Sequence, residues 1–236
     1  MLTAQGVSSP ANVSASSAAA TTTSATVLFA DLRGYFALAE RLPASQVVLL
    51  LGQFFGLLKS AVLQFGGQVY QIAQARMMAG FGVGDSSHTR TLEALAAARA
   101  IQETFNSLRT SWQGEFSIDT GVGVGIHRGE IAIGVFGPPG HEAPTLVGDT
   151  ANVAALLCNR ARAGEVLLSA VVNPSSNLAR AVNVSRQSLP FLHLPDLALR
   201  SRSSPLDVWC VPAIVRLEMR EGATAPSANP QDVSRR

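Results

Sequence analysis

Residues 25–34 read Ala-Thr-Val-Leu-Phe-Ala-Asp-Leu-Arg-Gly, and the fold prediction starts from this stretch. Its first six residues are mostly apolar, which predicts a short buried strand over Ala25–Ala30. The strand is expected to end at Asp31, where one carboxylate directly follows the apolar run. Such a carboxylate either closes a strand end or serves a chemical function, and the surrounding motifs are needed to distinguish the two.

The two ends of the chain differ in composition from its centre. Residues 1–24 are rich in Ala, Ser and Thr and carry no charged side chain, and residues 216–236 are polar with interspersed Gly and Pro. Segments with so few large apolar groups do not offset their ordering entropy, so both are predicted to be disordered tails. The 236-residue chain is 47% hydrophobic, which predicts one folded domain over residues 25–215.

The remaining elements follow from changes in hydrophobic period along the folded part. Helices are predicted from Ser45 to Phe65, after Asp85, and from Val147-Gly148-Asp149 to about Arg162. Strand pairs are predicted over Gln68–Gly82 and over Ser117–His127 with Glu130–Gly137, the latter joined near Arg128-Gly129, and a further strand over Val166–Ser169. Strands that alternate with helices, with two hairpins among them, predict an α/β sandwich with a mixed sheet.

Composition also excludes several classes of protein. The net charge is +2 and aromatic residues are 6% of the chain, so no basic, aromatic-rich surface for nucleic acid is expected. The apolar stretch Val47–Leu63 is interrupted by Gln53 and Lys59, so no membrane span is predicted. Cys158 and Cys210 lack ligand or redox spacing and are predicted to be buried thiols. With no recognisable export signal, a cytoplasmic location is expected.

Several segments form one collinear set of motifs: Val27-Leu-Phe-Ala-Asp-Leu-Arg-Gly34, Gly66-Gly67-Gln-Val69, Met78-Ala-Gly-Phe-Gly82, Gly123-Val-Gly-Ile-His-Arg-Gly-Glu130, Gly134-Val-Phe-Gly137 and Val147-Gly-Asp-Thr-Ala-Asn-Val-Ala-Ala155. Together they resemble one family, the catalytic domain of the class III nucleotidyl cyclases. The end of the domain, Leu197–Arg200 with Pro205–Pro212, is similar to the strand pair that closes such bacterial domains. The resemblance implies a ferredoxin-like βαββαβ core with a mixed, mainly antiparallel sheet.

The resemblance also implies a chemistry. In this family the 3′-hydroxyl of ATP or GTP attacks the α-phosphate of the same molecule, and two Mg²⁺ or Mn²⁺ ions held by two Asp residues align the reacting oxygens. A Lys and an Asp or Thr read the base, while an Asn positions the ribose and an Arg neutralises the transition state. Because the two halves of each site come from different subunits, the resemblance implies a head-to-tail dimer.

Part of the metal-binding half carries over to this sequence. Asp31 matches the first metal ligand, and the backbone carbonyl of Leu32 matches the group that assists it. Gly34 matches the glycine segment whose N–H groups face the phosphates. The Phe-Thr pair that commonly follows is replaced by Tyr35-Phe36, which places a large ring where a small hydroxyl would face phosphate.

The second hairpin departs from the family pattern. The family's Val-Asp-Lys-Phe-Ile-Gly-Asp is Val69-Tyr-Gln-Ile-Ala-Gln-Ala75 here, so Gln71 replaces the base-reading Lys and Ala75 replaces the second metal Asp. No carboxylate lies between Arg41 and Phe81, so a shift in alignment does not restore the ligand. The only lysine, Lys59, belongs to the first predicted helix.

The third predicted helix keeps one of its two family residues. Thr145, just ahead of it, matches the second base-reading position, and Asn152 matches the ribose-positioning Asn. Leu156 stands where the transition-state Arg is expected. Arg160 lies one turn further along and is interpreted as an exposed cation at the helix end, with substitution for the missing Arg as the alternative.

These departures predict a catalytically impaired class III cyclase domain that acts as a dimerising regulatory module in cyclic-nucleotide signalling. At most one Mg²⁺ or Mn²⁺ is expected, weakly bound at Asp31. The expected partners are a second copy or another cyclase-like domain, and a nucleoside triphosphate. Two alternatives stay open: a divergent but active cyclase that forms the 3′,5′-cyclic monophosphate and pyrophosphate, and a nucleotide sensor that binds without conversion.

Overall fold

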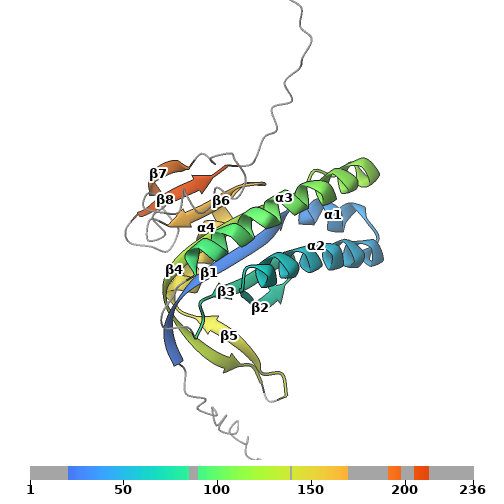
Figure 1. Cartoon of the computed structure of the whole chain (residues 1–236). Coiled ribbons are helices and arrows are strands. Elements are labelled where there is room, and N and C mark those ends of the chain that lie inside the picture. Colours follow the sequence, from blue (N-terminus) through green and yellow to red (C-terminus); the bar gives the residue numbers. More distant parts are fainter. Residues whose placement is uncertain (1–20, 85–89, 139, 170–190, 198–204, 213–236) are drawn as a thin grey trace, which may run out of the picture.

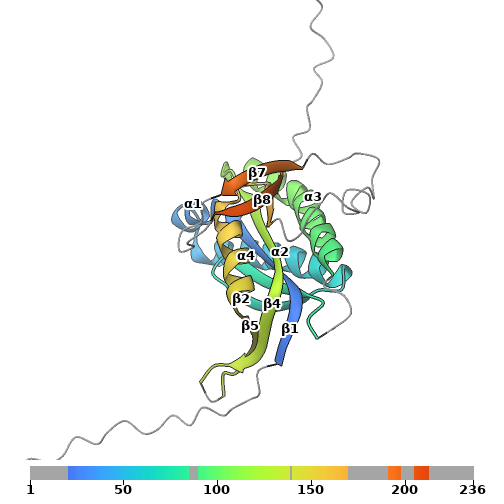
Figure 2. The same cartoon turned by 90° about the vertical axis from the view of Figure 1, so that its left-hand side faces the viewer.

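Two long antiparallel strands form the centre of the sheet (Figure 1). The computed structural model describes residues 21–84, 90–138, 140–169, 191–197 and 205–212. Strand β1 (Thr21–Arg33) pairs with β4 (Gly121–Phe136) over its whole length, from Thr21 opposite Ile133 to Arg33 opposite Gly121. The start of β1 and the end of β4 extend beyond the helices, together with β5 (Ala143–Val147) (Figure 2).

The length of these two strands corrects two predictions. The strand expected over Ala25–Ala30 begins at Thr21 and continues through Asp31 to Arg33, so residues 21–24 of the predicted tail lie in the sheet and the rest of that tail lies outside the described residues. The hairpin expected near Arg128-Gly129 is wrong, because β4 runs straight through both residues. The cause is non-local: Thr26 and Ala25 of β1 pair with Arg128 and Gly129, and this ladder holds the two residues extended.

The other strands complete a mixed sheet. Within the described part, the strand order is β2-β3-β1-β4-β6-β8-β7, and β5 pairs with β4 off this path. Among the strand pairs of these described ranges, only β4–β6 is parallel. The bounds are β2 Gln68–Ala73, β3 Arg76–Phe81, β6 Val166–Ser169, β7 Leu192–Leu197 and β8 Leu206–Val211. The hairpin over Gln68–Gly82 and the strand over Val166–Ser169 are thus confirmed, whereas the closing strand pair begins at Leu192 rather than at Leu197.

Helices cover both faces of the sheet, because the side chains of β1 alternate between them (Figure 1). Leu28, Ala30 and Leu32 belong to the main core cluster with α2 (Ala44–Gln64) and α3 (Thr91–Phe116). Val27 and Phe29 belong to a second cluster with α4 (Asp149–Arg160) on the other face. Asp31 and Arg33 continue this second alternation, so both lie on the α4 face of the strand.

Two features of the helical layer were not expected. The seven-residue helix α1 (Tyr35–Arg41) follows β1 directly, where no helix was predicted. Helix α2 is long and apolar enough to cross a membrane by length and composition alone, with a mean hydropathy of 1.7 over 18 residues. Its buried residues are Val47, Leu50, Phe54, Leu58, Ala61 and Val62, and all of these except Val47 belong to the core cluster that α2 shares with α3.

Candidate active site

The carboxylate of Asp31 lies between two arginine side chains. Arg33, two residues along β1, donates from Nη1 to Asp31 Oδ2. Arg76 is the cross-strand partner of Asp31 on β3, and its Nη2 lies 3.4 Å from the same oxygen. The side chains of Asp31, Arg33 and Arg76 are 17%, 25% and 32% exposed, so these charges are partly shielded from water. The position predicted to hold a metal ion therefore already holds two cationic side chains.

The two arginines also connect this corner of the sheet to the end of helix α4. Arg33 Nε donates to the carbonyl oxygen of Ala161 at 3.1 Å, and Arg33 Nη2 donates to the carbonyl oxygen of Cys158. Arg76 Nη2 donates to Asn159 Oδ1 at 2.5 Å. The last carbonyl groups of a helix lack partners within the helix and carry partial negative charge, so guanidinium groups stabilise this end.

Asp31 and Ala75, the two positions that the resemblance assigns to metal ligands, lie on adjoining parts of the backbone. Ala75 lies in the turn between β2 and β3, and its carbonyl oxygen accepts the N–H of Leu32 at 3.0 Å. However, Ala75 is 4% exposed and its methyl group belongs to the main core cluster. The backbone geometry that brings two ligands together is therefore present, but one of the two carboxylates is missing.

The donor set does not fit a pair of divalent cations. Hard ions such as Mg²⁺ require several oxygen ligands, with carboxylates to balance their charge. Here one carboxylate remains, and it is neutralised by Arg33 and Arg76. Within the described ranges, no group of three or more His, Cys, Asp or Glu side chains is arranged to hold a metal ion.

Gly34 is required by the backbone at this position. Its φ is +85°, in the left-handed region, and it precedes the first residue of α1. A Cβ atom at this position would lie 2.5 Å from the carbonyl oxygen of Asp119. Phe36, one of the two rings that replace the family's Phe-Thr pair, is 82% exposed. The glycine thus has a structural reason that is independent of phosphate binding.

The two base-reading positions lie on neighbouring strands. Gln71 is exposed on β2, next to a register shift between Val69 and Gln71 that leaves Tyr70 bulged. Thr145 is half-buried on β5, opposite Gly134 of β4. Strands β2 and β5 are in contact, so the fold brings the two positions to the same region of the sheet. Gln71 carries no charge there, unlike the family's lysine.

Asn152 and Leu156, the two positions that the resemblance assigns to the third predicted helix, both lie on α4. Asn152 is exposed in the first turn, and its N–H donates to the carbonyl oxygen of Gly148 at 3.3 Å. Leu156 packs against an apolar cluster that includes Val153 and Leu157. Arg160 is exposed in the last turn of α4. Asn152 and the Arg76-bonded Asn159 are seven residues apart, which is roughly 10 Å along a helix axis.

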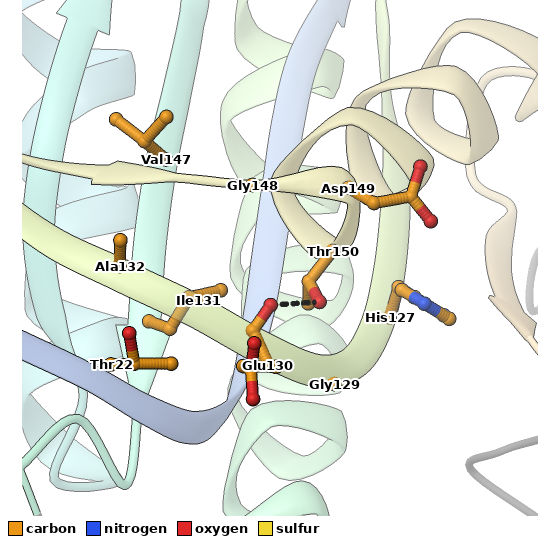
Figure 3. Close-up of a pocket in the computed structure, with 10 residues that line it drawn as sticks. All are labelled: Thr22, His127, Gly129, Glu130, Ile131, Ala132, Val147, Gly148, Asp149 and Thr150. Atoms are coloured by element: carbon orange, nitrogen blue, oxygen red, sulfur yellow. Dashed lines mark hydrogen bonds between the residues drawn. The ribbon is translucent and has the colours of Figure 1, made fainter.

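A separate pocket lies at the other end of α4 (Figure 3). It has a volume of about 470 Å³ and is lined by the first residues of β1, the middle of β4, the end of β5 and the start of α4, including Thr22, His127, Glu130, Asp149 and Thr150. Thr150 Oγ1 donates to the carbonyl oxygen of Glu130 at 2.6 Å, which fixes the first turn of α4 on β4. None of the predicted site residues lines this pocket.

Comparison with known proteins assigns the chain and its fold to one family. The family model of the adenylate and guanylate cyclase catalytic domain matches residues 18–190, most of the chain. This chain belongs to the class III nucleotidyl cyclase family. An adenylate cyclase of Anabaena cylindrica is 29% identical to this cyclase domain over 137 residues, which are 58% of this chain and 27% of that protein. The domain thus spans about a quarter of the length of this curated relative.

Solved structures confirm the cyclase fold. The adenylyl cyclase CyaB from P. aeruginosa superposes with a TM-score of 0.73 at 23% identity, covering 84% of this chain and 97% of that one. The guanylyl cyclase Cya2 superposes with a TM-score of 0.69 at 20% identity, covering 85% and 97%. The predicted fold class is therefore confirmed.

The sequence reasoning did not identify three residues that surround Asp31 in this cyclase domain: Arg33, Arg76 and Asn159. Arg33 lies two positions after Asp31 on the same strand, so period-two alternation already placed both on one face. Arg76 directly follows the position of the lost metal ligand, and only the register of β1 with β3 shows that it lies opposite Asp31. A search for a cation beside the lost ligand would have found Arg76.

Proposed function

We propose that this cyclase domain has lost most or all cyclase turnover and acts as a dimerising regulatory module in cyclic-nucleotide signalling. The observation that carries the proposal is the state of Asp31, whose carboxylate is paired with Arg33 and Arg76 while Ala75 offers no second carboxylate. A divalent ion at this position would have to displace two guanidinium groups and would gain one ligand side chain.

The size of the losses supports this proposal. An arginine that neutralises a phosphoryl-transfer transition state contributes roughly 10³- to 10⁵-fold in rate where such residues have been measured. Leu156, at that position, packs in an apolar cluster and has no charge to offer. The missing carboxylate removes stabilisation of the same developing charge, so the two effects overlap rather than multiply. Even the mildest combination of the two losses is expected to leave little cyclase activity.

A dimer partner does not repair the site. In the head-to-tail arrangement that the resemblance implies, one composite site takes Ala75 as a metal position, and the other takes Gln71 and Leu156 as base and transition-state positions. Pairing with an intact cyclase domain therefore leaves both composite sites damaged. The proposed role of the homodimer or heterodimer is regulatory. In the heterodimer, the domain binds a cyclase partner and contributes no turnover of its own.

The experiment is a search for product at high protein concentration. Purified protein is incubated with ATP or GTP and Mn²⁺, and cyclic AMP and cyclic GMP are measured beside an intact bacterial cyclase domain as positive control. The expected result is no steady turnover. Multiple turnover that the Asp31→Ala variant loses would contradict the proposal and identify a divergent active cyclase. The Arg160→Ala variant would then show whether Arg160 acts in place of the missing arginine.

A further inference from the structure

We propose that the guanidinium group of Arg76 takes the place of the divalent cations, so that this domain binds the polyphosphate of a nucleoside triphosphate directly and without metal. The inference rests on the proposed function, because it assumes that the metal site is lost. To the proposed function it adds the class of ligand, which is a polyphosphate anion without Mg²⁺. It also adds the residue that contacts this ligand, Arg76.

The position of Arg76 carries the first step. A metal ion in an intact site bridges protein carboxylates and substrate phosphates, and an arginine fork bridges the same two groups by charge-assisted hydrogen bonds. Arg76 already makes the protein half of such a bridge, with Nη2 placed between Asp31 Oδ2 at 3.4 Å and Asn159 Oδ1 at 2.5 Å. Its place opposite Asp31 is set by the register of β1 with β3.

The unused donors of Arg76 carry the second step. A guanidinium group has five N–H donors, and the two contacts made by Nη2 leave those of Nε and Nη1. Within the described residues these remaining donors have no partner. The side chain is 32% exposed, so it is accessible from solvent. Arg33 differs, because its Nε, Nη1 and Nη2 all bond Asp31 or the carbonyl groups of α4.

The local charge favours an anion. Asp31, Arg33 and Arg76 together carry a net charge of +1, from one carboxylate and two guanidinium groups. The chain has no acidic residue from Leu42 to Gly84, which includes β2, β3 and the turn that carries Ala75. The one carboxylate near a phosphate group at Arg76 is therefore already neutralised by the two arginines. No metal ion is needed to offset repulsion between that carboxylate and the phosphate.

The test measures the binding of fluorescent ATP and GTP analogues in EDTA, by fluorescence anisotropy, and then with added Mg²⁺. The proposal predicts binding in EDTA that Mg²⁺ does not strengthen and that inorganic tripolyphosphate competes away. Arg76→Ala should weaken binding by about 10- to 100-fold, the usual effect of losing hydrogen bonds to a charged group. The matched control is Arg109→Ala, which removes a surface arginine and its ion pair with Asp119 from α3, on the other face of the sheet.

The Asp31→Asn variant distinguishes direct binding of phosphate by Arg76 from binding through a metal ion. It gives this answer even if the Arg76→Ala variant fails to fold. Direct binding by Arg76 predicts unchanged or tighter affinity, because the substitution removes a negative charge beside the phosphates. Metal-mediated binding predicts the loss of affinity, because the remaining carboxylate ligand is gone. The proposal is overturned by binding that requires Mg²⁺, by no binding in EDTA, by affinity that Arg76→Ala leaves unchanged, or by loss of binding in Asp31→Asn. Turnover is measured separately, so failure here and failure of the proposed function are distinguishable.

Discussion

Asp31→Asn is expected to destabilise the folded domain, and the direction of this effect reports how the carboxylate is used. In an intact two-metal site without its ions, adjacent carboxylates repel each other, so neutralising one relieves strain. Here the same substitution removes the one acidic side chain that pairs with Arg33 and Arg76 in the described part of the chain. The asparagine keeps a hydrogen-bond acceptor but no charge, and two guanidinium groups then face each other across it.

The magnitude follows from the geometry. Because both arginines contact the same oxygen, their nearest nitrogens are at most roughly 6 Å apart, and two unit charges at that distance repel by roughly 3 kcal/mol at an effective dielectric constant of about 20. Side chains that are 17–32% exposed are partly screened by water, which reduces this figure. The expected loss in the free energy of unfolding is about 1–3 kcal/mol. This lies between the usual effects of breaking an exposed ion pair and of breaking a fully buried one.

The assay is thermal and urea unfolding followed by circular dichroism at low and high salt. The expected fall in melting temperature is about 3–9 °C for a domain of this size, and it should shrink at high salt. Asp119→Asn is the matched control, because it breaks the exposed Arg109–Asp119 pair and is expected to change stability little. An unchanged or raised melting temperature for Asp31→Asn would refute the paired state of this carboxylate.

Two further predictions concern the contact between α4 and the sheet. Gly125→Ala should destabilise the domain by about 1–3 kcal/mol or more in urea unfolding, because its Cβ would lie 2.1 Å from the Cys158 nitrogen and 2.3 Å from the Ala154 oxygen. Gly134→Ala, on the same strand with no atom within 4 Å, is the control expected to change little. Burial raises the pKa of the Cys158 thiol from 9.0 to about 12, so iodoacetamide should label it in urea but hardly at all in the folded protein at neutral pH. Because the unfolded thiol ionises first, its contribution to stability is present below pH 9 and is lost between pH 9 and about pH 12. Rapid labelling of the folded protein would show that α4 does not cover this residue.

The hydrophobic pattern was sufficient for the elements that are locally encoded. Helix α2 and the β2–β3 hairpin follow from apolar periodicity and from the turn signals that flank them. Helix α1 was missed because it has only seven residues and its N-cap, Gly34, makes no side-chain capping bond. Arg128-Gly129 resembles a turn, but pairing with β1 keeps it extended, and no local signal reveals that ladder.

The candidate site shows the same division between local and non-local information. Alignment to the family predicted the losses at Gln71, Ala75 and Leu156, since each depends only on which residue occupies a position. It did not predict that arginines neutralise Asp31, because that pairing depends on strand register and on where α4 ends. The sequence predicted at most one weakly bound ion at Asp31 and gave no sign that its carboxylate is bonded to Arg33 and close to Arg76, as the structure shows.

Counting bound manganese tests the absence of a two-metal site most directly. The protein is titrated with Mn²⁺ in the presence of a non-cyclisable triphosphate analogue, and electron paramagnetic resonance measures free and bound ion, with an intact bacterial cyclase domain as reference. No Mn²⁺ is expected to bind to the protein beyond what the analogue alone binds. Two ions per protomer, displaced by the Asp31→Ala substitution, would contradict it.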